Sequence, residues 1–319
     1  MATYNHEDVI GKAIESVRNQ EYQNWELLIV DDQSTDNTKM VIEAFAKTEP
    51  RIRLFCELHR GIWKLHDTYN VALKNSRGDL VAILEGDDCW PTNKLAKQVP
   101  WHLNYDDLIL SYGRVGILDD HDQNSGPQQP SFSGLVSTSD FLECLLARKA
   151  LMIPVSVVIN AKTLREIGGF QFFRGYPATD FPTFLKLVLC QGTIYRSNEV
   201  LGYYRQHENQ VTKNFGVELV EGALNLKLQL WADLPQDVKE RMNITKEDII
   251  RIDTKLLSDA YLGILRHILI QRDRKQIWPN AKKLWSSGGP KRKLQALYSL
   301  SAGVLGFDME GILTFVRKR

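Results

Sequence analysis

The sequence predicts an α/β fold, in which a mostly parallel sheet is flanked by helices and followed by a C-terminal helical appendage. Three observations predict it. Short apolar runs of strand length alternate with segments of helical period as far as residue 105. Several runs end in acidic or hydroxyl side chains, where open α/β sheets bind ligands. From Glu218 onward the pattern is mostly helical.

The chain is expected to begin with a helix, a strand and a second helix. The first helix is predicted from apolar residues at helical spacing, namely Val9, Ile10, Ala13, Ile14 and Val17. Asn5 is its expected cap. A strand at 27–30 runs into polar residues 31–36, which are expected to cap a helix with inward positions Met40, Val41, Ala44 and Phe45.

The alternation then repeats and finally loosens. Strands are predicted at 52–56 and 80–84, with helices at 63–74 and 94–103. Further strands are predicted at 108–115, 152–159 and 193–205, and helices at 141–148 and 181–189. A polar loop rich in Gly, Pro and Gln spans 119–133. We place a domain boundary near residue 215, which divides a sheet domain (1–215) from a helical region (216–319).

Composition limits the class of protein. With 319 residues, 43% of them hydrophobic and 25% charged, the chain suffices for one large or two modest domains with a core. No apolar run approaches the roughly 18 to 20 residues of a membrane span, and no secretory signal pattern is present, so a cytoplasmic protein is expected. The four cysteines are scattered without a CxxC pair; we expect them to be buried, with neither a disulfide framework nor a zinc site.

Charge is distributed unevenly along the chain. From Arg266 onward twelve Lys and Arg face three acids, a net charge of +9, whereas the remaining 28 basic and 36 acidic residues give −8. Two basic triplets, 291–293 and 317–319, bracket a mostly apolar stretch, 294–316. A terminal helix pair packed on the body is one interpretation. Contact of this basic tail with an anionic membrane surface is the other, and no motif for reading nucleic acid is present.

An acidic cluster follows the strand predicted at 80–84. Glu85, Asp87 and Asp88 provide three carboxylates within four residues. The strand itself is a continuous apolar run, typical of a strand covered on both faces, and ligands bind at the carboxyl ends of such strands. Hard oxygen ligands suit Mg²⁺ or Mn²⁺, which takes its remaining ligands from water and phosphate. The cluster therefore predicts a metal bound to a nucleotide.

A second pair of acids follows the strand predicted at 27–30. The carboxylate of Asp31 or Asp32 is expected to accept the imide N–H of uracil or thymine, or to bind a ribose hydroxyl. Turn-building is the alternative for both residues. His6, His59 and His66 show no metal-ligand spacing.

Four motifs, in order along the chain, resemble the family 2 glycosyltransferases, inverting enzymes of the GT-A fold. They are Thr3-Tyr4-Asn5, the 30–36 segment VDDQSTD, Glu85-Gly86-Asp87-Asp88 with Trp90-Pro91, and Tyr204-Arg205-Gln206-His207. The resemblance covers residues 3 to about 212. It implies a GT-A (Rossmann-like) sheet, a nucleotide-diphosphate sugar as donor and a DxD-type metal segment.

The sequence departs from the family pattern at four places. The apolar strand expected before Thr3 is reduced to Met1 and Ala2, so the first strand is expected to be truncated or missing. Glu85 stands where the family most often has Asp, and Thr179 replaces the acid that usually precedes the Asp matched by Asp180. The QxxRW motif of processive synthases is absent, which favours transfer of single sugars.

The resemblance also implies roles for individual residues. Nucleotide or cofactor binding is expected of a set spread over the motifs: Thr3, Tyr4, Asn5, Asp31, Asp32, Asn70, Glu85 and Arg205. Metal binding is expected of Asp87, Asp88 and His207. Asp180 is the candidate general base that removes the proton of the acceptor hydroxyl, and capping of the following helix is its alternative role. Trp90 and Thr179 are expected at the acceptor site, although core packing competes for Trp90.

The leading functional hypothesis is a metal-dependent, non-processive transferase that moves a sugar from a UDP-sugar to a glycan or lipid-linked glycan in surface-polysaccharide synthesis. The basic tail fits a position at the inner face of the plasma membrane. Two alternatives remain. A nucleotidyltransferase would require a glycine-rich, basic phosphate loop near the amino terminus, which is not present. A non-catalytic nucleotide-sugar binding protein would keep the pocket without turnover.

Overall fold

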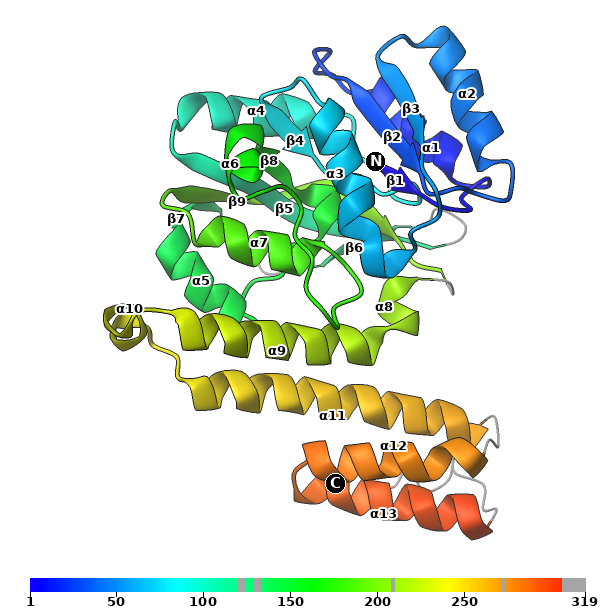
Figure 1. Ribbon diagram of the computed structural model, residues 1–319, viewed down its shortest axis with the longest axis vertical. Coiled ribbons are helices and arrows are strands. Elements are labelled where there is room, and N and C mark those ends of the chain that lie inside the picture. The colour runs from blue at the N-terminus through cyan, green and yellow to red at the C-terminus, as the bar shows by residue number, and fades with distance from the viewer. Residues whose placement is uncertain (120–123, 129–132, 208–209, 271–273, 306–319) are drawn as a thin grey trace. The chain divides into compact units, whose positions relative to one another are not determined.

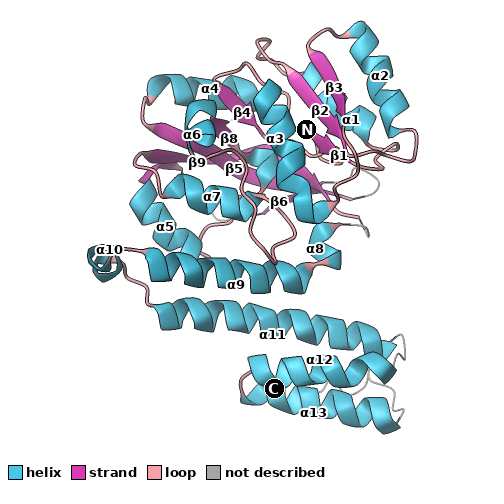
Figure 2. Cartoon of the chain, viewed as in Figure 1, coloured by secondary structure: helices cyan, strands magenta, loops and turns pink. Residues whose placement is uncertain are grey.

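The computed structural model describes residues 1–119, 124–128, 133–207, 210–270 and 274–305. The chain forms two compact units, Met1–Asn214 and Phe215–Arg319. The first holds all the strands and the second is helical (Figure 1, Figure 2).

The sheet of the first unit is built in two parts. The smaller part has the order β1-β2-β3 and consists of Ala2–Thr3, Leu27–Asp31 and Ile52–Cys56, all parallel. The larger part has the order β4-β8-β5-β9-β7, formed by Leu80–Ala82, Val158–Asn160, Leu108–Leu118, Thr193–Arg205 and Gly134–Ser137. Strand β6 (Asn124–Gln128) pairs with β5 outside that path.

The larger part of the sheet is mixed. Its β5/β9 pair is parallel, whereas β8 runs antiparallel to both β4 and β5, β7 runs antiparallel to β9, and β6 runs antiparallel to β5. Parallel pairs need a crossover of a dozen or more residues, and the β5–β6 connection is too short for one. The predicted α/β class with flanking helices is confirmed, and the parallel arrangement holds for β1–β3 and for β5 with β9.

Strand β1 lies at the junction of the two parts. Ala2 pairs with Val30 of β2 on one side and forms an isolated parallel bridge with Glu85 on the other. The Gly86 N–H donates to the Ala2 carbonyl oxygen at 3.0 Å, and the Asp32 N–H donates to that of Thr3 at 3.0 Å. The first strand, which was expected to be truncated or missing, thus consists of two residues at this central position.

Helices cover the sheet of the first unit. They are α1 (Ile10–Arg18), α2 (Thr38–Thr48), α3 (Leu65–Asn75), α4 (Lys94–Asn104), α5 (Thr138–Leu146), α6 (Ala161–Glu166), α7 (Asp180–Val188) and α8 (Val211–Asn214). Two single 3₁₀ turns, η1 (Ile62–Lys64) and η2 (Pro154–Ser156), complete the set. The predicted strand at 152–159 was therefore wrong over its first half, where η2 forms instead.

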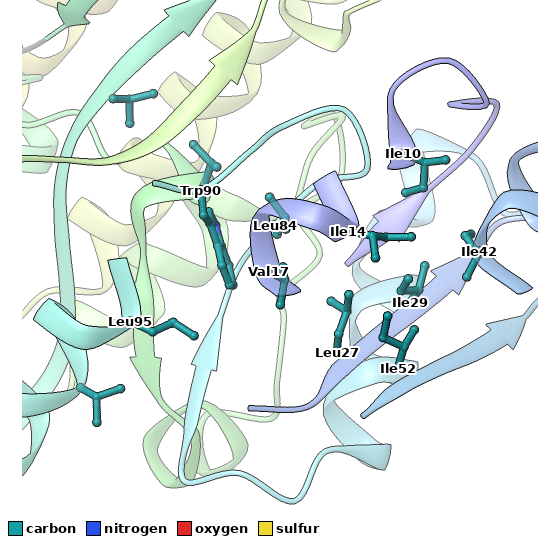
Figure 3. Close-up of a cluster of buried hydrophobic side chains, with 13 residues drawn as sticks. Ile10, Ile14, Val17, Leu27, Ile29, Ile42, Ile52, Leu84, Trp90 and Leu95 are labelled. Atoms are coloured by element: carbon teal, nitrogen blue, oxygen red, sulfur yellow. The ribbon is translucent and has the colours of Figure 1, made fainter. Parts of the chain in front are cut away.

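A cluster of apolar side chains joins α1 and α2 to the sheet (Figure 3). Ile10 and Ile14 of α1 are fully buried, as is Ile42 of α2, and they pack with strand residues such as Ile29. The inward position expected for Met40 was wrong, because its side chain is 62% exposed and Ile42 takes the buried place.

The predicted cap of the first helix was also wrong. Helix α1 begins at Ile10, and its N-cap, Val9, makes no side-chain hydrogen bond. Asn5 has a positive φ of 52° and directs its side chain to the backbone of Thr35 instead.

A buried polar network fastens α4 to the sheet. The Lys94 side chain is 0% exposed and its Nζ donates to Gln98 Oε1 at 2.6 Å. Gln98 Nε2 in turn donates to the carbonyl oxygens of Ser111 and Ser156. His102 Nε2 lies 3.0 Å from Ser111 Oγ. Burial lowers the pKa of Lys94 well below its usual value and that of His102 to about 4.

The second unit is a set of helices around its own core. They are α9 (Gly216–Asp233), α10 (Gln236–Arg241), α11 (Lys246–Ile270), α12 (Arg274–Ser287) and α13 (Pro290–Leu305). The core combines residues of four helices: Val217, Tyr261, Leu262, Leu265, Ile268, Ile277, Ala281, Leu284 and Ala296. A fully buried ion pair joins α9 to α11, since Lys227 Nζ lies 3.0 Å from Asp253 Oδ2.

Other expectations from sequence have mixed outcomes. The cysteines are free, but their expected burial was wrong, because Cys56 is exposed and the other three are half-buried. Of the predicted loop at 119–133, residues 124–128 form β6, whereas 120–123 and 129–132 lie outside the described residues, as does the basic triplet 317–319. Within the described ranges, no helix is both long and apolar enough to cross a membrane.

We expect His102 to make stability depend on pH. Its pKa is about 4 in the folded chain and near 6.5 when unfolded, so the unfolded state binds a proton first as the pH falls. The stabilisation is complete above pH 6.5 and declines toward pH 4, by about 3 kcal/mol at most. Replacing His102 by Gln should therefore flatten this part of the stability–pH curve, measured by urea unfolding.

The matched control is Asn104→Gln, at an exposed residue of the same helix that does not titrate, which is expected to keep the slope of the unaltered chain. An unchanged slope in the His102 variant would contradict the prediction.

Candidate active site

The acidic turn, residues 85–89, is held from both sides by strands. The Gly86 N–H bonds to β1, as described above. Cys89 pairs with Tyr203 of β9 through two hydrogen bonds, from Cys89 N at 3.1 Å and from Tyr203 N at 2.8 Å. The turn therefore lies where the end of β4, the end of β1 and the last residues of β9 meet.

Asp87 forms a pair with His207 at this junction. His207 Nε2 lies 3.0 Å from Asp87 Oδ2, and the two side chains are 24% and 16% exposed. Burial alone would raise the pKa of Asp87, but the hydrogen bond from His207 and the charges of His6 and His207 outweigh it and lower that pKa. The site thus keeps an ionised, partly accessible carboxylate beside an imidazole.

Glu85 is half-buried in the same turn. Its Oε1 accepts a hydrogen bond from the hydroxyl of Tyr69 on α3 at 2.7 Å. Burial, with the charges of Asp87 and Asp180, raises the pKa of Glu85 to about 7, although the Tyr69 bond acts to lower it. Glu85 is therefore within electrostatic reach of both predicted reactive carboxylates.

Asp88 faces inward, with a 1% exposed side chain. Its Oδ1 accepts the backbone N–H of Arg205 at 2.9 Å. Burial and the charges of Asp87 and Glu85 raise the pKa of Asp88 well above its usual value. The Asp88 and Glu85 side chains also share a hydrogen bond, which requires a proton on one of the two carboxyl groups. Asp88 thus connects the turn to β9 and to the Glu85 side chain.

The Arg205 side chain hydrogen-bonds to the backbone of the turn and to that of a neighbouring segment. Its side chain is 3% exposed; Nε donates to the Asp87 carbonyl oxygen and Nη1 to that of Asp119, each at 3.0 Å. This geometry does not favour the predicted contact with the cofactor, because the guanidinium is buried against main-chain carbonyls. Arg205 fixes the shape of the acidic turn.

The N-terminal motif lies on the other side of the turn. Thr3 is 3% exposed and its Oγ1 lies 3.1 Å from His6 Nδ1. Asn5 accepts from the Thr35 N–H at 2.8 Å, so its side chain shapes the turn after β2. Tyr4 is 39% exposed and its ring lies 4.5 Å from that of His59. Tyr4 is thus the aromatic residue of this motif, and its ring is accessible.

His6 is a site residue that sequence reasoning missed. Burial lowers its pKa, and the charges of Asp87 and His207 act on it, which places it beside that pair. A Cβ on Gly86 would lie only 2.7 Å from His6 Nδ1, so the two segments are in close approach. His6 is far from the acidic turn in the sequence, so no local pattern predicts that the two are close. The available signal was that His6 directly follows the Thr3-Tyr4-Asn5 motif.

Asp31 and Asp32 hold loops at the end of β2. Asp31 is 2% exposed; its Oδ1 accepts from the hydroxyl of Ser34 at 2.5 Å. Asp32 accepts the backbone N–H groups of Arg60 at 2.8 Å and Gly61 at 2.9 Å. Both carboxylates therefore build turns, the alternative considered from sequence, and each keeps lone pairs that a ligand can use.

Asn70 makes a paired contact with the backbone of Phe170. Its Nδ2 donates to the Phe170 carbonyl oxygen at 2.9 Å, and its Oδ1 accepts the Phe170 N–H at 2.8 Å. With both polar atoms engaged in this way, the predicted cofactor contact is not favoured. Gly169 lies against this pair with φ +84°, where an added Cβ would meet Asn70 Oδ1 at 2.3 Å.

Asp180 is the first residue of α7. Its Oδ1 accepts from the Tyr176 hydroxyl at 3.3 Å, and burial raises its pKa. The charge of Asp180 also acts on Tyr69 and Glu85, which places it across from the acidic turn. The alternative capping role also has support, because the Asp180 carboxylate accepts the backbone N–H of Phe181, although the N-cap position itself is Thr179.

The two predicted acceptor residues are turned inward. Thr179 is 4% exposed and its hydroxyl donates to the Gln171 carbonyl oxygen at 2.9 Å, so it fixes the loop before α7. Trp90 is 7% exposed and packs in the core with Leu84 and Leu95 (Figure 3). It borders a cleft of about 550 Å³ by α1 and α2, which no other predicted site residue lines. Core packing, the competing interpretation, describes Trp90.

The donor set fits a cation that is bound jointly with a phosphate group. Among the described residues, no group of three or more His, Cys, Asp or Glu side chains is arranged to hold a metal by itself. Mg²⁺ and Mn²⁺ are usually held by one or two carboxylates together with substrate phosphates and water. Asp87 and His207 offer such a partial set, and both side chains are partly accessible.

Comparison with known proteins gives three kinds of match. Residues 1–167 match a family model described as Glycosyl transferase family 2. The chain is 37% identical over 122 residues to UDP-Glc:alpha-D-GlcNAc-diphosphoundecaprenol beta-1,3-glucosyltransferase WfgD of Escherichia coli, covering 38% of this chain and 46% of WfgD. It is 27% identical over 228 residues to WfaP of the same organism, which carries the same description, covering 71% of this chain and 84% of WfaP.

A solved structure shares the fold. The mannosyltransferase PcManGT from Pyrobaculum calidifontis, in complex with GDP-Man and Mn²⁺, superposes with a TM-score of 0.59 at 18% identity, covering 95% of this chain and 84% of that one. At this identity the likeness supports the fold.

We expect Gly86→Ala to destabilise the chain through the site. The added Cβ would lie 2.5 Å from Thr3 Oγ1 and 2.7 Å from His6 Nδ1, so the turn or β1 must shift. Overpacking of this kind lowers the free energy of unfolding by about 1 to 3 kcal/mol. Thermal unfolding measures the loss.

Gly11→Ala on α1 is the matched control, because its Cβ would meet nothing nearer than 3.7 Å. Equal stability of the two variants would show that the close approach at Gly86 is absent.

Proposed function

This chain belongs to glycosyl transferase family 2, and from that premise we propose that it is an inverting, non-processive, metal-dependent enzyme using a UDP-sugar donor. One observation carries the proposal. Asp87, which pairs with His207, and the Asp180 carboxylate both act electrostatically on Glu85, so a cation-binding group and a candidate base flank one site. Transfer of a sugar from a nucleotide diphosphate needs both.

The donor diphosphate binds at the acidic turn in this proposal. Asp87 and His207 hold a Mg²⁺ or Mn²⁺ ion, with Asp88 adjacent. Such a cation, when bound, offsets the negative charge that develops on the leaving diphosphate. The likeness to a fold bound to Mn²⁺ supports this choice of cofactor. The accessible ring of Tyr4 and the carboxylates of Asp31 and Asp32 lie at neighbouring strand ends, where the nucleoside is expected.

Asp180 is the proposed base. It accepts the proton of the acceptor hydroxyl as that oxygen attacks the anomeric carbon, opposite the leaving group. Its raised pKa brings the carboxylate nearer to the operating pH, which favours proton transfer. Tyr176, which donates to Asp180 Oδ1, orients the carboxylate. Thr179 holds the backbone before it through its bond to Gln171.

The proposed acceptor is a glycan or a lipid-linked glycan in surface-polysaccharide synthesis. Its support is the description of WfgD and WfaP as acting on a sugar diphosphoundecaprenol. Such an acceptor places the enzyme at the inner face of the plasma membrane. The absence of the QxxRW motif supports single-sugar transfer rather than polymerisation.

We expect Asp180→Asn to lower kcat by about 10² to 10⁴ while the affinity for UDP is unchanged, because an amide cannot take the proton. Transfer is followed with labelled UDP-sugar, and UDP binding by calorimetry in Mn²⁺. A non-catalytic binding protein has no turnover to lose, so this variant separates the two hypotheses.

The matched control is Asp106→Asn, at an exposed carboxylate outside the site. It is expected to retain both turnover and binding. Full turnover by Asp180→Asn would remove this residue as the base.

We expect Asp87→Asn to weaken UDP binding in Mn²⁺ by at least tenfold, and to change binding little when the metal is chelated. The reason is that the carboxylate contributes through the cation and not through the nucleoside. Calorimetric titration of UDP with Mn²⁺, and with chelator in its place, gives both values.

His207→Ala is expected to behave in the same way with a smaller loss. UDP affinity that is independent of Mn²⁺ in the unaltered chain would contradict the cation site and leave the proposed base untouched.

A further inference from the structure

Helices α12 and α13 contain basic residues and no acidic residue of their own. Between residues 274 and 305 the sequence contains no Asp or Glu. Its basic residues are Arg274, Lys275, Lys282, Lys283, Lys291, Arg292 and Lys293. Surfaces of soluble proteins ordinarily mix the two signs. This pair of helices is therefore suited to an anionic partner.

The same helices expose large apolar side chains. On α12, Trp278 is 64% exposed and Trp285 is 43% exposed. They lie seven residues apart, almost two full turns, and so on one side of the helix. That side flanks the buried row formed by Ile277, Ala281 and Leu284. Lys275 and Lys282, also seven residues apart and exposed, lie next to the two tryptophans.

Helix α13 extends this surface. Leu294 is 68% exposed and Leu297 is 51% exposed, three residues apart on one side of the helix. Lys293 Nζ lies 5.6 Å from the ring centroid of Trp285, so the exposed side of α13 adjoins the tryptophan side of α12. We call Trp278, Trp285, Leu294 and Leu297, with Lys275, Lys282 and Lys293, the Trp–Leu face.

We propose that the Trp–Leu face docks on an anionic lipid surface. Tryptophan favours the boundary between headgroups and acyl chains, where its ring is apolar and its N–H stays hydrated. Lysine stems lie along apolar surface while the ammonium groups reach the headgroups. Each basic residue near such a membrane contributes about 1 kcal/mol. The described helices are not long and apolar enough to span a bilayer, so the contact is peripheral.

A second copy of the chain is a poorer occupant. Pairing two Trp–Leu faces would bring their lysines together, while α12 and α13 contribute no acid of their own, and like charges in contact repel. Anionic lipid supplies the missing negative charge and an apolar layer together. The inference rests on the proposed function in one respect, because a lipid-linked acceptor lies at a membrane. Vesicle binding requires neither the sugar donor nor the acceptor, so the experiment can fail for one proposal without failing for the other.

Vesicle flotation of the full chain tests the proposal. The vesicles are phosphatidylcholine alone, or phosphatidylcholine mixed with phosphatidylglycerol. We expect binding to the mixed vesicles, weakening as salt is raised, and little binding to the neutral ones. The double variants Trp278→Ser/Trp285→Ser and Lys275→Glu/Lys282→Glu should each lose at least tenfold in partitioning. Their thermal unfolding should match that of the unaltered chain, because these side chains are exposed.

Matched controls use exposed residues of the first unit. Leu58→Ser/Leu103→Ser, at side chains 79% and 74% exposed, and Lys47→Glu/Lys162→Glu should bind as the unaltered chain does.

Three results would overturn the proposal. The first is no flotation with either vesicle, and the second is flotation that the two face variants leave unchanged. The third is that the unaltered chain sediments as a dimer without lipid, whereas the Trp278→Ser/Trp285→Ser variant sediments as a monomer. This result would assign the Trp–Leu face to contact with a second copy of the chain.

Discussion

The site depends on the backbone pairing of the acidic turn between β1 and β9. A turn with three carboxylates in four residues repels itself, and its shape must be imposed by the surrounding chain. Hydrogen bonds from Gly86 to Ala2 and between Cys89 and Tyr203 impose it. The Arg205 guanidinium adds hydrogen bonds to the carbonyl oxygens of Asp87 in the turn and of Asp119 after β5. These contacts bring Asp87 to His207, which lies far from it in the sequence.

The same pairing places the three acids in different electrostatic surroundings. The pKa of Asp87 is lowered because an imidazole faces it, whereas the pKa of Glu85 and that of Asp88 are raised by loss of contact with water and by the neighbouring charges. A set of like charges taken out of water is stable only if some of them are neutral or a cation is present. In the proposed function, a cation that arrives with the negatively charged substrate meets this requirement.

Several motif residues hold the protein's own backbone. Asn70 binds the backbone of Phe170, Asp32 binds the backbone after β3, and Arg205 binds carbonyl oxygens. These loops have no regular strand pairing to hold them, so side chains supply the hydrogen bonds that fix their shape. A motif residue can shape its loop in this way and still keep lone pairs for a ligand, as the carboxylate of Asp32 does.

The sequence by itself determined the alternation of strands and helices, the acidic turn and the family, because these depend on local periodicity and on residues close together in the chain. Strand β9 was predicted with its observed bounds, 193–205. Tertiary structure alone decided which strands run antiparallel, that Trp90 lies in the core, and that His6 joins Asp87 and His207. These outcomes arise from pairings between distant segments, which no local pattern encodes.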